Sequence, residues 1–235
     1  MKRTVIRPYR PADRSVVRRV CADTGFLGRP IDPVFEDREL FADYLTGYYL
    51  RVEPGTTLVC EVDGEVMGYL MGCRRPILHQ MYQALGNFSI AARAIYRCYR
   101  RPYGAAAREF MRWIALNAWR EVPAAPRFVP HFHINLLAGA RSVKNTRRLI
   151  QSFLELLQRA GHERVYGQMV TYETRRNDKL FERYGFRVTH RAEITKYRRS
   201  YPGRVFLSTL VKDLRVGPPL ALTRQPVRDD SHDTR

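Results

Sequence analysis

Paired cysteines and long apolar runs are both missing from this chain of 235 residues. No two of its four cysteines have C-x-x-C spacing, and the first ten residues, MKRTVIRPYR, lack the apolar core of a secretory signal. We therefore expect reduced thiols and a cytoplasmic protein. No stretch approaches the roughly 20 apolar residues that a membrane span needs, so no transmembrane segment is predicted. The cysteines are Cys21, Cys60, Cys73 and Cys98.

Metal-ligand spacing is also absent from the histidines. None of the six forms an i, i+4 pair, and none has a cysteine neighbour at ligand spacing. His131 and His133 alternate along a predicted strand and offer two ligands, but isolated strand histidines are more often structural. The sequence therefore predicts no metal site.

Acidic residues are few relative to basic ones. There are 41 Lys and Arg against 23 Asp and Glu, and the net charge is +18. Such an excess attracts an acidic partner, which can be nucleic acid, an anionic membrane surface, an acidic protein or a polyanionic cofactor. An arginine-rich but merely solvated surface explains the charge equally well. The hydrophobic content of 45% is typical of a folded globular chain.

Apolar periodicity divides the N-terminal part into a strand, two helices and a hairpin. The strand is predicted at 4–7, and the helices over 11–22 and 36–50. The runs TTLVCEV and EVMGYLMG are typical of paired strands, because the Asp63-Gly64 dipeptide between them favours a two-residue turn.

Residues 74–130 differ from the rest in their proline and arginine content. Five prolines punctuate two helical patches, over 77–100 and 104–121. The segment has ten Arg, no Lys and two Glu, a net charge of +8, together with six Tyr and Trp. Arginines interleaved with aromatic rings make this basic insert a candidate surface for nucleic acid or an anionic membrane.

The remaining chain alternates strands and helices. HFHINLL is a predicted strand with Phe132, Ile134 and Leu136 on one face. The elements expected after it are a helix over 147–160, a strand over 163–170, a short helix over 175–184, and strands from 186 and over 205–211. We expect one domain over 1–213 and a disordered tail over 214–235.

The segment between HINLL and the next helix has the layout of a phosphate-binding turn. A buried strand, a tight loop and the start of an amphipathic helix place backbone N–H groups opposite an anion. Such turns usually carry glycine, but this loop has Ser142, Lys144 and Thr146. Their hydroxyls and charge can replace some backbone contacts. The alternative is that Ser142 only caps the helix and Lys144 faces solvent.

This order of elements resembles the GCN5-related N-acetyltransferase (GNAT) superfamily, most specifically over 131–188. The residues that carry this resemblance are Leu136-Leu137, Arg141, Arg147-Arg148-Leu149-Ile150 and Leu180-Phe181-Glu182-Arg183-Tyr184-Gly185-Phe186. The run GYLMG at 68–72 is a weaker match. HINLL and the insert before it resemble the branch associated with O-GlcNAc hydrolases and its bacterial relatives.

The resemblance implies an α/β (α+β) fold with a mixed, mostly antiparallel central sheet flanked by helices, and a helical insert between the third and fourth strands. It also implies acetyl-CoA as acyl donor. The residues implied to bind it are Leu136, Leu137, Arg141, Ser142, Val143, Lys144, Asn145 and Thr146. Lys144 and Thr146 stand where the family's loop has its two defining glycines, so the cofactor loop is degenerate.

Acetyl transfer to an amine needs a base for the amine, a donor for the oxyanion and an acid for the leaving thiolate. Phe181 occupies the position of the tyrosine that often serves as the acid in this family, and it has no proton to give. The family's usual Asn aligns with Thr174. Tyr172 is the favoured substitute, with Tyr184 and Tyr166 as alternatives, although such tyrosines are more often packing residues. The candidate bases are Glu173 and His133, and Asn135 is a candidate substrate-orienting residue.

Two functions remain open from the sequence. The first is an acyl-CoA-dependent N-acyltransferase that acts on a small-molecule or protein amine, with an acidic acceptor favoured by the basic insert. The second is an inactive GNAT-fold binding module that uses the insert to bind a polyanion or acidic partner. The acceptor and the oligomeric state are not predicted.

Overall fold

Seven strands form one sheet in the order β1-β2-β3-β4-β5-β7-β6. This computed structural model describes residues 3–100, 102–172 and 182–215. The strands are β1 (Thr4–Pro8), β2 (Thr57–Val62), β3 (Glu65–Cys73), β4 (His131–Leu136), β5 (Arg164–Tyr172), β6 (Arg187–Glu193) and β7 (Val205–Asp213). Among them β4 and β5 are parallel, and the other neighbouring pairs are antiparallel. The predicted mixed, mostly antiparallel sheet is confirmed.

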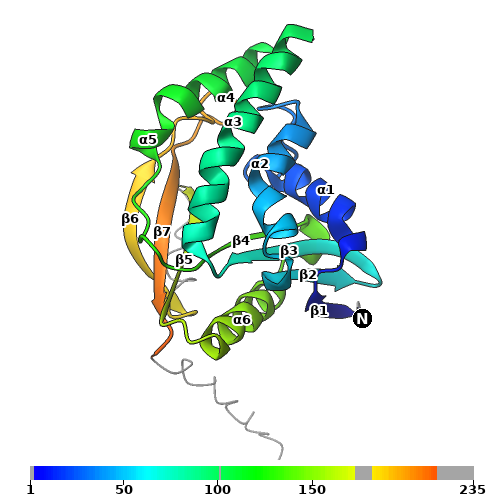
Figure 1. Cartoon of the computed structure of the whole chain (residues 1–235), viewed down its shortest axis with the longest axis vertical. Coiled ribbons are helices and arrows are strands. Elements are labelled where there is room, and N and C mark those ends of the chain that lie inside the picture. Colours follow the sequence, from blue (N-terminus) through cyan, green and yellow to red (C-terminus); the bar gives the residue numbers. More distant parts are fainter. Residues whose placement is uncertain (1–2, 101, 173–181, 216–235) are drawn as a thin grey trace, which may run out of the picture.

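Helices cover both faces of this sheet (Figure 1). They are α1 (Arg14–Thr24), α2 (Arg38–Arg51), α3 (Pro76–Arg100), α4 (Ala105–Leu116), α5 (Ala118–Glu121) and α6 (Val143–Arg159), with short 3-10 turns at Pro11–Asp13, Pro54–Thr56 and Ala138–Ala140. The insert α3–α5 lies between β3 and β4, as predicted. None of the helices among the described residues is long and apolar enough to cross a membrane.

The alternation of β4 decides which side chains enter which layer. Phe132, Ile134 and Leu136 pack with α6, as the sequence pattern predicts. His131 and His133 therefore lie on the opposite face, where their rings meet tyrosines of α2 and β3.

The β2–β3 hairpin turns at Asp63-Gly64 as predicted. Both residues have positive φ, 52° at Asp63 and 89° at Gly64, which is the conformation of a type I′ turn. The register of the hairpin places Val62 opposite Glu65.

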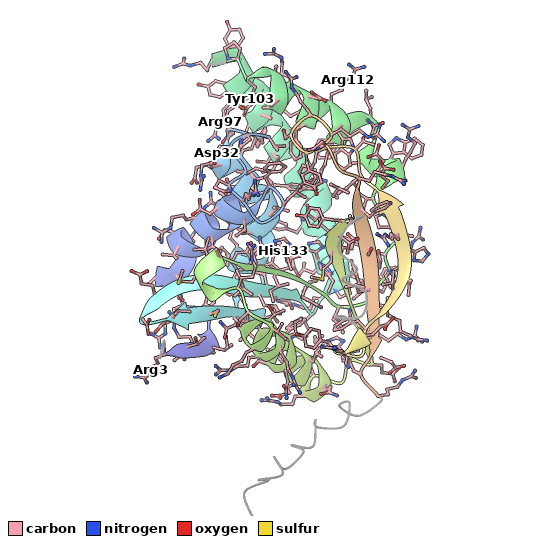
Figure 2. All side chains as sticks on the ribbon, turned by 180° about the vertical axis from the view of Figure 1, so that it is seen from behind. Arg3, Asp32, Arg97, Tyr103, Arg112 and His133 are labelled. Atoms are coloured by element: carbon pink, nitrogen blue, oxygen red, sulfur yellow. The ribbon has the colours of Figure 1, made fainter. Side chains whose placement is uncertain are left out.

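A single carboxylate joins the insert to α2. Asp37 caps α2 by accepting from the Leu40 N–H at 3.0 Å, and it also accepts from the Tyr103 hydroxyl at 2.8 Å and from Arg97. Figure 2 shows Arg97 and Tyr103 near one another at the insert. The turn between α3 and α4 is thus fixed to the domain.

Two sequence-based boundaries need correction. Helix α6 begins at Val143 and not at 147, because the Ser142 side chain caps it. Leu214, which was assigned to the tail, is buried in the core, and its N–H donates to the Glu163 carbonyl at 2.7 Å. The rest of the expected tail, 216–235, and most of the helix expected over 175–184 lie outside the described residues.

Candidate active site

Strands β4 and β5 pair over two positions and then separate. Their register joins His131 to Tyr166 and Phe132 to Gly167, and no later pair is formed in the described strands. Figure 1 shows β4 crossing the view while β5 stands nearly upright beside β7. The sheet is therefore split at its centre.

The split leaves backbone groups of β4 without a strand partner. The Leu137 N–H donates to Met67 of β3 at 2.9 Å, so the odd-numbered residues of β4 face β3. By alternation, the N–H and C=O groups of Ile134 and Leu136 face the split. A buried unpaired strand edge is costly, so this edge is suited to an extended ligand that carries amide groups.

The N-terminus of α6 follows directly at the open end of β4. Ser142 Oγ accepts from the Asn145 N–H at 3.1 Å, and the Asn145 side chain donates to the Ala140 carbonyl at 2.8 Å. Among the described residues, the N–H groups of Val143 and Lys144 have no acceptor. Because the Lys144 side chain is also exposed, this helix start attracts an anion.

The four residues Val143 to Thr146 were expected in a loop, and they form the first turn of α6 instead. Ser142 is its cap, as the alternative interpretation held. Asn145 is buried and Thr146 is half-buried. Glycine is consequently not needed for this turn, since a regular helix start has ordinary negative φ angles.

Arg141 reaches across the end of the split. Its Nη2 donates to the Gly28 carbonyl at 3.0 Å and to the Leu136 carbonyl at 3.2 Å. The guanidinium thus joins the free edge of β4 to the connection between α1 and α2. Leu137, the other predicted cofactor residue here, turns its backbone toward β3.

Tyr172 reaches the same connection from β5. Its hydroxyl donates to the Leu27 carbonyl at 3.2 Å, and its ring packs edge-on against Tyr201 at 5.5 Å. Tyr172 and Arg141 therefore contact consecutive carbonyls, those of Leu27 and Gly28, from the two sides of the split. Sequence reasoning did not find these two loop residues; both have positive φ, and only glycine signals that in the sequence.

His133 and Asn135 lie together on the face covered by α1 and α2. The Asn135 amide donates to the Tyr69 hydroxyl at 3.0 Å and lies 3.2 Å from His133 Nε2, and the His133 ring stacks on Tyr69. Burial lowers the pKa of His133 to about 4, so the ring is neutral at neutral pH. Figure 2 shows His133 deep in the middle of the molecule.

The other sequence-predicted groups are spread out. Tyr166 packs against His131 at 5.1 Å, in the closed part of the sheet, and burial raises its pKa. The Tyr184 hydroxyl donates to the Val143 carbonyl at 3.4 Å, beside the start of α6. Glu173, Thr174 and Phe181 lie outside the described residues.

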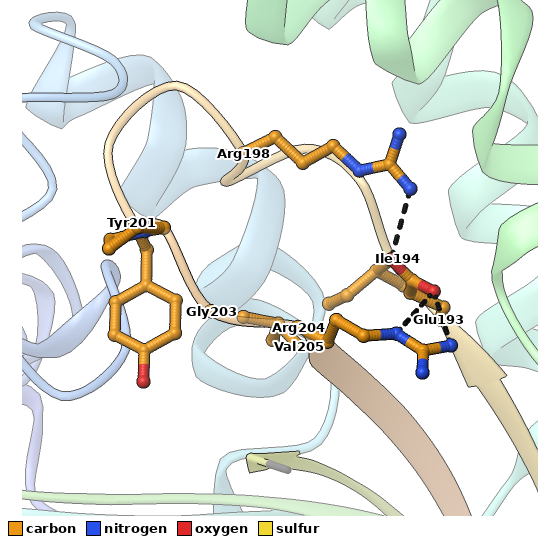
Figure 3. A pocket seen from close by; sticks show the side chains of 8 residues that line it. Glu193, Ile194, Arg198, Tyr201, Gly203, Arg204 and Val205 are labelled. Atoms are coloured by element: carbon orange, nitrogen blue, oxygen red, sulfur yellow. Dashed lines mark hydrogen bonds and ion pairs between the residues drawn. The ribbon is translucent and has the colours of Figure 1, made fainter.

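A pocket of about 430 Å³ opens in the connection between β6 and β7. Figure 3 shows Arg198 and Arg204 converging on Glu193, with hydrogen bonds of 3.0 and 2.9 Å from their Nη2 atoms. Tyr201 also lines this pocket and contacts Tyr172, so the pocket adjoins the β5 side of the split.

The search for metal-ligand spacing in the sequence did not find a group of possible metal ligands that the structure brings together. Cys73, His79 and His131 each offer a ligand atom, and these atoms lie within 4.8 Å of one another. They come from β3, α3 and β4, so no local motif contains them. No metal is inferred for the split itself.

Comparison with known proteins supports the fold. No family model matches the chain, and no curated protein matches it. Among solved structures, SsHAT is 24% identical with a TM-score of 0.55, and the match covers 90% of this chain and 98% of that one.

Two further similar structures are described as acetyltransferases, and one of them contains acetyl-CoA. A Salmonella typhimurium protein, described as a candidate acetyltransferase and solved with acetyl-CoA, is 12% identical with a TM-score of 0.51, covering 93% of this chain and 99% of its own. A GCN5-related N-acetyltransferase from Kribbella flavida is 18% identical with a TM-score of 0.51, covering 89% and 97%. The split seven-stranded sheet of this chain is the GNAT fold.

Proposed function

We propose that this chain is an acyl-CoA-dependent N-acyltransferase with acetyl-CoA as its default donor. The observation that carries the proposal is the unpaired edge of β4, which runs directly into a helix start with free N–H groups. An extended ligand with amide groups at one end and phosphates at the other fits these two features together. The assignment to the O-GlcNAc hydrolase-associated branch stays a prediction from HINLL and the insert.

The residues at the split offer the types of chemical group that coenzyme A requires. The backbone groups of Ile134 and the N–H of Leu136 are available to its amides, and the N–H groups of Val143 and Lys144 are available to its pyrophosphate. The Lys144 ammonium and the Thr146 hydroxyl supplement them. When bound, acetyl-CoA supplies the activated acyl group.

The proposed proton donor lies on the β5 side. We assign the acid role to Tyr172, whose hydroxyl already donates to Leu27 and can donate to a thiolate instead. Glu173 follows it directly and is the proposed base, because the low pKa of His133 makes that ring a weak base. Asn135 is proposed to orient the acceptor amine.

The acceptor is proposed to enter beside the β6–β7 pocket. Arg198 and Arg204 both donate to the Glu193 carboxylate at the wall of that pocket. The net charge of +18 favours an acceptor, small molecule or protein, that carries a carboxylate or phosphate near its amine.

The alternative, a polyanion-binding module, receives less support from the contacts. Arg93 and Arg97 of the insert are paired with Asp43 and Asp37. Both arginines are thus already engaged by carboxylates within the domain. If the module hypothesis holds, nucleic-acid affinity falls steeply with added salt.

Calorimetry with acetyl-CoA tests the proposal. We expect micromolar binding by the native chain and a five- to tenfold loss, about 1 kcal/mol, in Lys144→Ala. Arg159→Ala removes the same charge from the opposite end of α6 and serves as the matched control, with affinity unchanged. Absence of binding at millimolar acetyl-CoA would overturn the enzyme assignment and leave the binding module.

A further inference from the structure

Cys73, His79 and His131 meet where the insert leaves the sheet. Cys73 ends β3 and lies directly opposite His131 in the β3–β4 register, so the two side chains share a face. His79 is in the first turn of α3, and its ring meets that of His131 edge-on with centroids 4.7 Å apart. One ligand atom from each residue lies within 4.8 Å of the other two.

The ring of His131 is oriented by a tyrosine and has a free nitrogen. Its Nε2 lies 2.9 Å from the Tyr49 hydroxyl, while its Nδ1 is buried and has no hydrogen-bond partner. An unsatisfied buried nitrogen costs free energy, so this atom needs an explanation. Coordination of a metal by Nδ1 would satisfy this nitrogen. The Nε2–H group would then donate to the Tyr49 hydroxyl, as the second ring nitrogen of a metal-bound histidine usually does to a neighbouring group.

His79 is held in a comparable way. Its Nε2 lies 3.4 Å from the side-chain amide of Gln83, one turn further along α3. The amide oxygen and nitrogen of Gln83 can exchange places by rotation, so the amide can accept from Nε2–H. This leaves Nδ1 of His79 as the second available ring nitrogen.

Cys73 supplies a thiol as the third ligand. Its side chain is fully buried, and it lies opposite His131 at the end of β3. A bound divalent cation displaces the thiol proton, so Cys73 would bind as the thiolate. The thiolate would then balance one of the two positive charges of the ion.

We infer that Cys73, His79 and His131 form a metal site, and Zn²⁺ matches its ligands best. One thiolate and two imidazoles are ligands that zinc prefers, and water can occupy a fourth position. Tetrahedral zinc ligands of this kind lie about 3.3–3.6 Å apart, so the group closes by about 1 Å on binding. His79 is half-buried and can make that movement. The ion would join the start of the insert to β3 and β4.

The test uses the full chain after dialysis against a chelator. Titration with Co²⁺ is expected to give a thiolate charge-transfer band at one equivalent, and Zn²⁺ is expected to displace it. Cys73→Ser should abolish the band, and His131→Gln should weaken Zn²⁺ binding by about 100-fold. Cys98→Ser, a change of another cysteine on α3, should alter neither.

A second readout separates metal binding from simple misfolding. Zn²⁺ should raise the Tm of the native chain but not that of His79→Gln, whose ring is half-buried and whose loss the fold can tolerate. A charge-transfer band that persists in Cys73→Ser overturns the site. So does the absence of any band, or an equal rise in Tm for His79→Gln and the native chain.

A separate observation concerns the outer face of α3. Its apolar residues recur at alternating intervals of four and three, and all are exposed: Met81, Leu85, Phe88, Ala92, Ile95 and Tyr99. The exposed fraction reaches 79% at Phe88 and 86% at Tyr99. The stripe extends for about 27 Å at 1.5 Å per residue. Apolar residues with a mean spacing of 3.5 form the contact seam of a coiled coil, in which the partner is another helix.

The apolar stripe is left uncovered although the opposite face of α3 packs against the rest of the domain. Leu78 and Tyr82 pack on the α2 side, and Ile90, Ala94 and Cys98 pack on α4 and its neighbours. Arg93 and Arg97 are held by carboxylates of α2 and its cap, so they are not available for lipid phosphates. An unused heptad face of this kind points to another protein helix and disfavours an anionic membrane.

The geometry points to a second copy of this chain, with the two α3 helices antiparallel. Residues 76–92 carry no charged side chain, whereas 93–100 carry three arginines. A parallel pair would bring the arginine-bearing ends of both copies together, with the exposed Arg100 of each copy among them. An antiparallel pair places each cationic end beside the uncharged end of the other copy, and it closes as a two-fold dimer.

Sedimentation of the native chain and two variants tests this interface. We expect a native dimer, a folded monomer with a cooperative thermal transition for Leu85→Glu, and a dimer for the control Asn87→Glu, which is exposed on α3 outside the seam. A monomeric native chain overturns the inference. Retention on anionic vesicles by that monomer, lost in Leu85→Glu, would assign the face to a membrane instead.

Discussion

Arg141 and Gly28 are in contact across 113 residues of sequence, with Nη2 of the arginine 3.0 Å from the glycine carbonyl. Gly28 has φ +81°, and a Cβ at this position would lie 2.9 Å from that same Nη2 atom. The backbone conformation therefore favours glycine, and a Cβ would in addition push the end of the Arg141 side chain away from its two carbonyl partners. The contact fixes the α1–α2 connection to the open end of the split.

Gly28→Ala should destabilise the fold and displace Arg141. Left-handed φ alone costs alanine about 1–2 kcal/mol, and the close contact adds to that. Gly64→Ala is the matched control, because Gly64 has φ +89° with nothing within 4 Å of its Cβ position. Urea denaturation measures both. Equal losses for the two variants would show that Arg141 does not constrain position 28.

Tyr172→Phe should lower kcat for acetyl transfer by about 100-fold or more, with little change in KM for acetyl-CoA. The reason is that the hydroxyl is the proposed proton donor. Tyr166→Phe removes a hydroxyl from the same strand within the closed part of the sheet, and should leave kcat unchanged. Steady-state kinetics decide the role: an increase in KM at constant kcat would mean that Tyr172 only positions the Leu27–Gly28 connection.

Ser142→Ala should cost about 1 kcal/mol of stability, because it leaves the Asn145 N–H without its acceptor at the start of α6. Chemical denaturation measures the loss. Ser152→Ala makes the same chemical change in the middle of this helix and should cost nothing. A neutral result at Ser142 would show that water replaces the cap fully.

Asp37→Asn should loosen the insert at neutral pH, by about 1–3 kcal/mol, since Arg97 loses its charged partner. Burial acts to raise the pKa of Asp37, but hydrogen bonds from Arg97, the Leu40 N–H and Tyr103 outweigh it, and the pKa is lowered. The folded form therefore releases the proton more readily than the unfolded chain. The stabilisation is present above about pH 4 and is lost as the pH falls through the folded pKa.

Urea titrations at pH 7 and pH 3 test this dependence, with Glu109→Gln as the control. Glu109 pairs with Arg199 at 3.1 Å, but both side chains are more than half exposed, so that pair should contribute little. The difference in stability between the native chain and Asp37→Asn should be smaller at pH 3 than at pH 7. A constant difference at both pH values would contradict the assignment.

Local patterns predicted much of the fold. The Asp63-Gly64 turn and the alternation of Phe132, Ile134 and Leu136 depend on neighbours in sequence, so both were confirmed. The start of α6 was misplaced because Val143, Asn145 and Thr146 are weak helix formers. Here the Ser142 cap and the buried Asn145 side chain outweigh propensity.

The candidate site was less accessible to sequence reasoning, because it depends on distant pairings. The β4–β5 split follows from where two strands stop pairing, and no composition reveals that. The contacts of Arg141 with Gly28 and of Tyr172 with Leu27 connect segments more than 100 residues apart. The grouping of Cys73, His79 and His131 likewise arises only after β3 and β4 pair.

The parting of β4 from β5 should also be visible in deuterium uptake. The central strands of a sheet are normally its slowest to exchange, because each amide hydrogen is bonded to a neighbouring strand. In β4 the amides of His133 and Asn135 point toward β3, whereas those of Ile134 and Leu136 point into the split. The middle of the sheet should therefore show alternating slow and fast exchange along one strand, and acetyl-CoA should slow the fast amides.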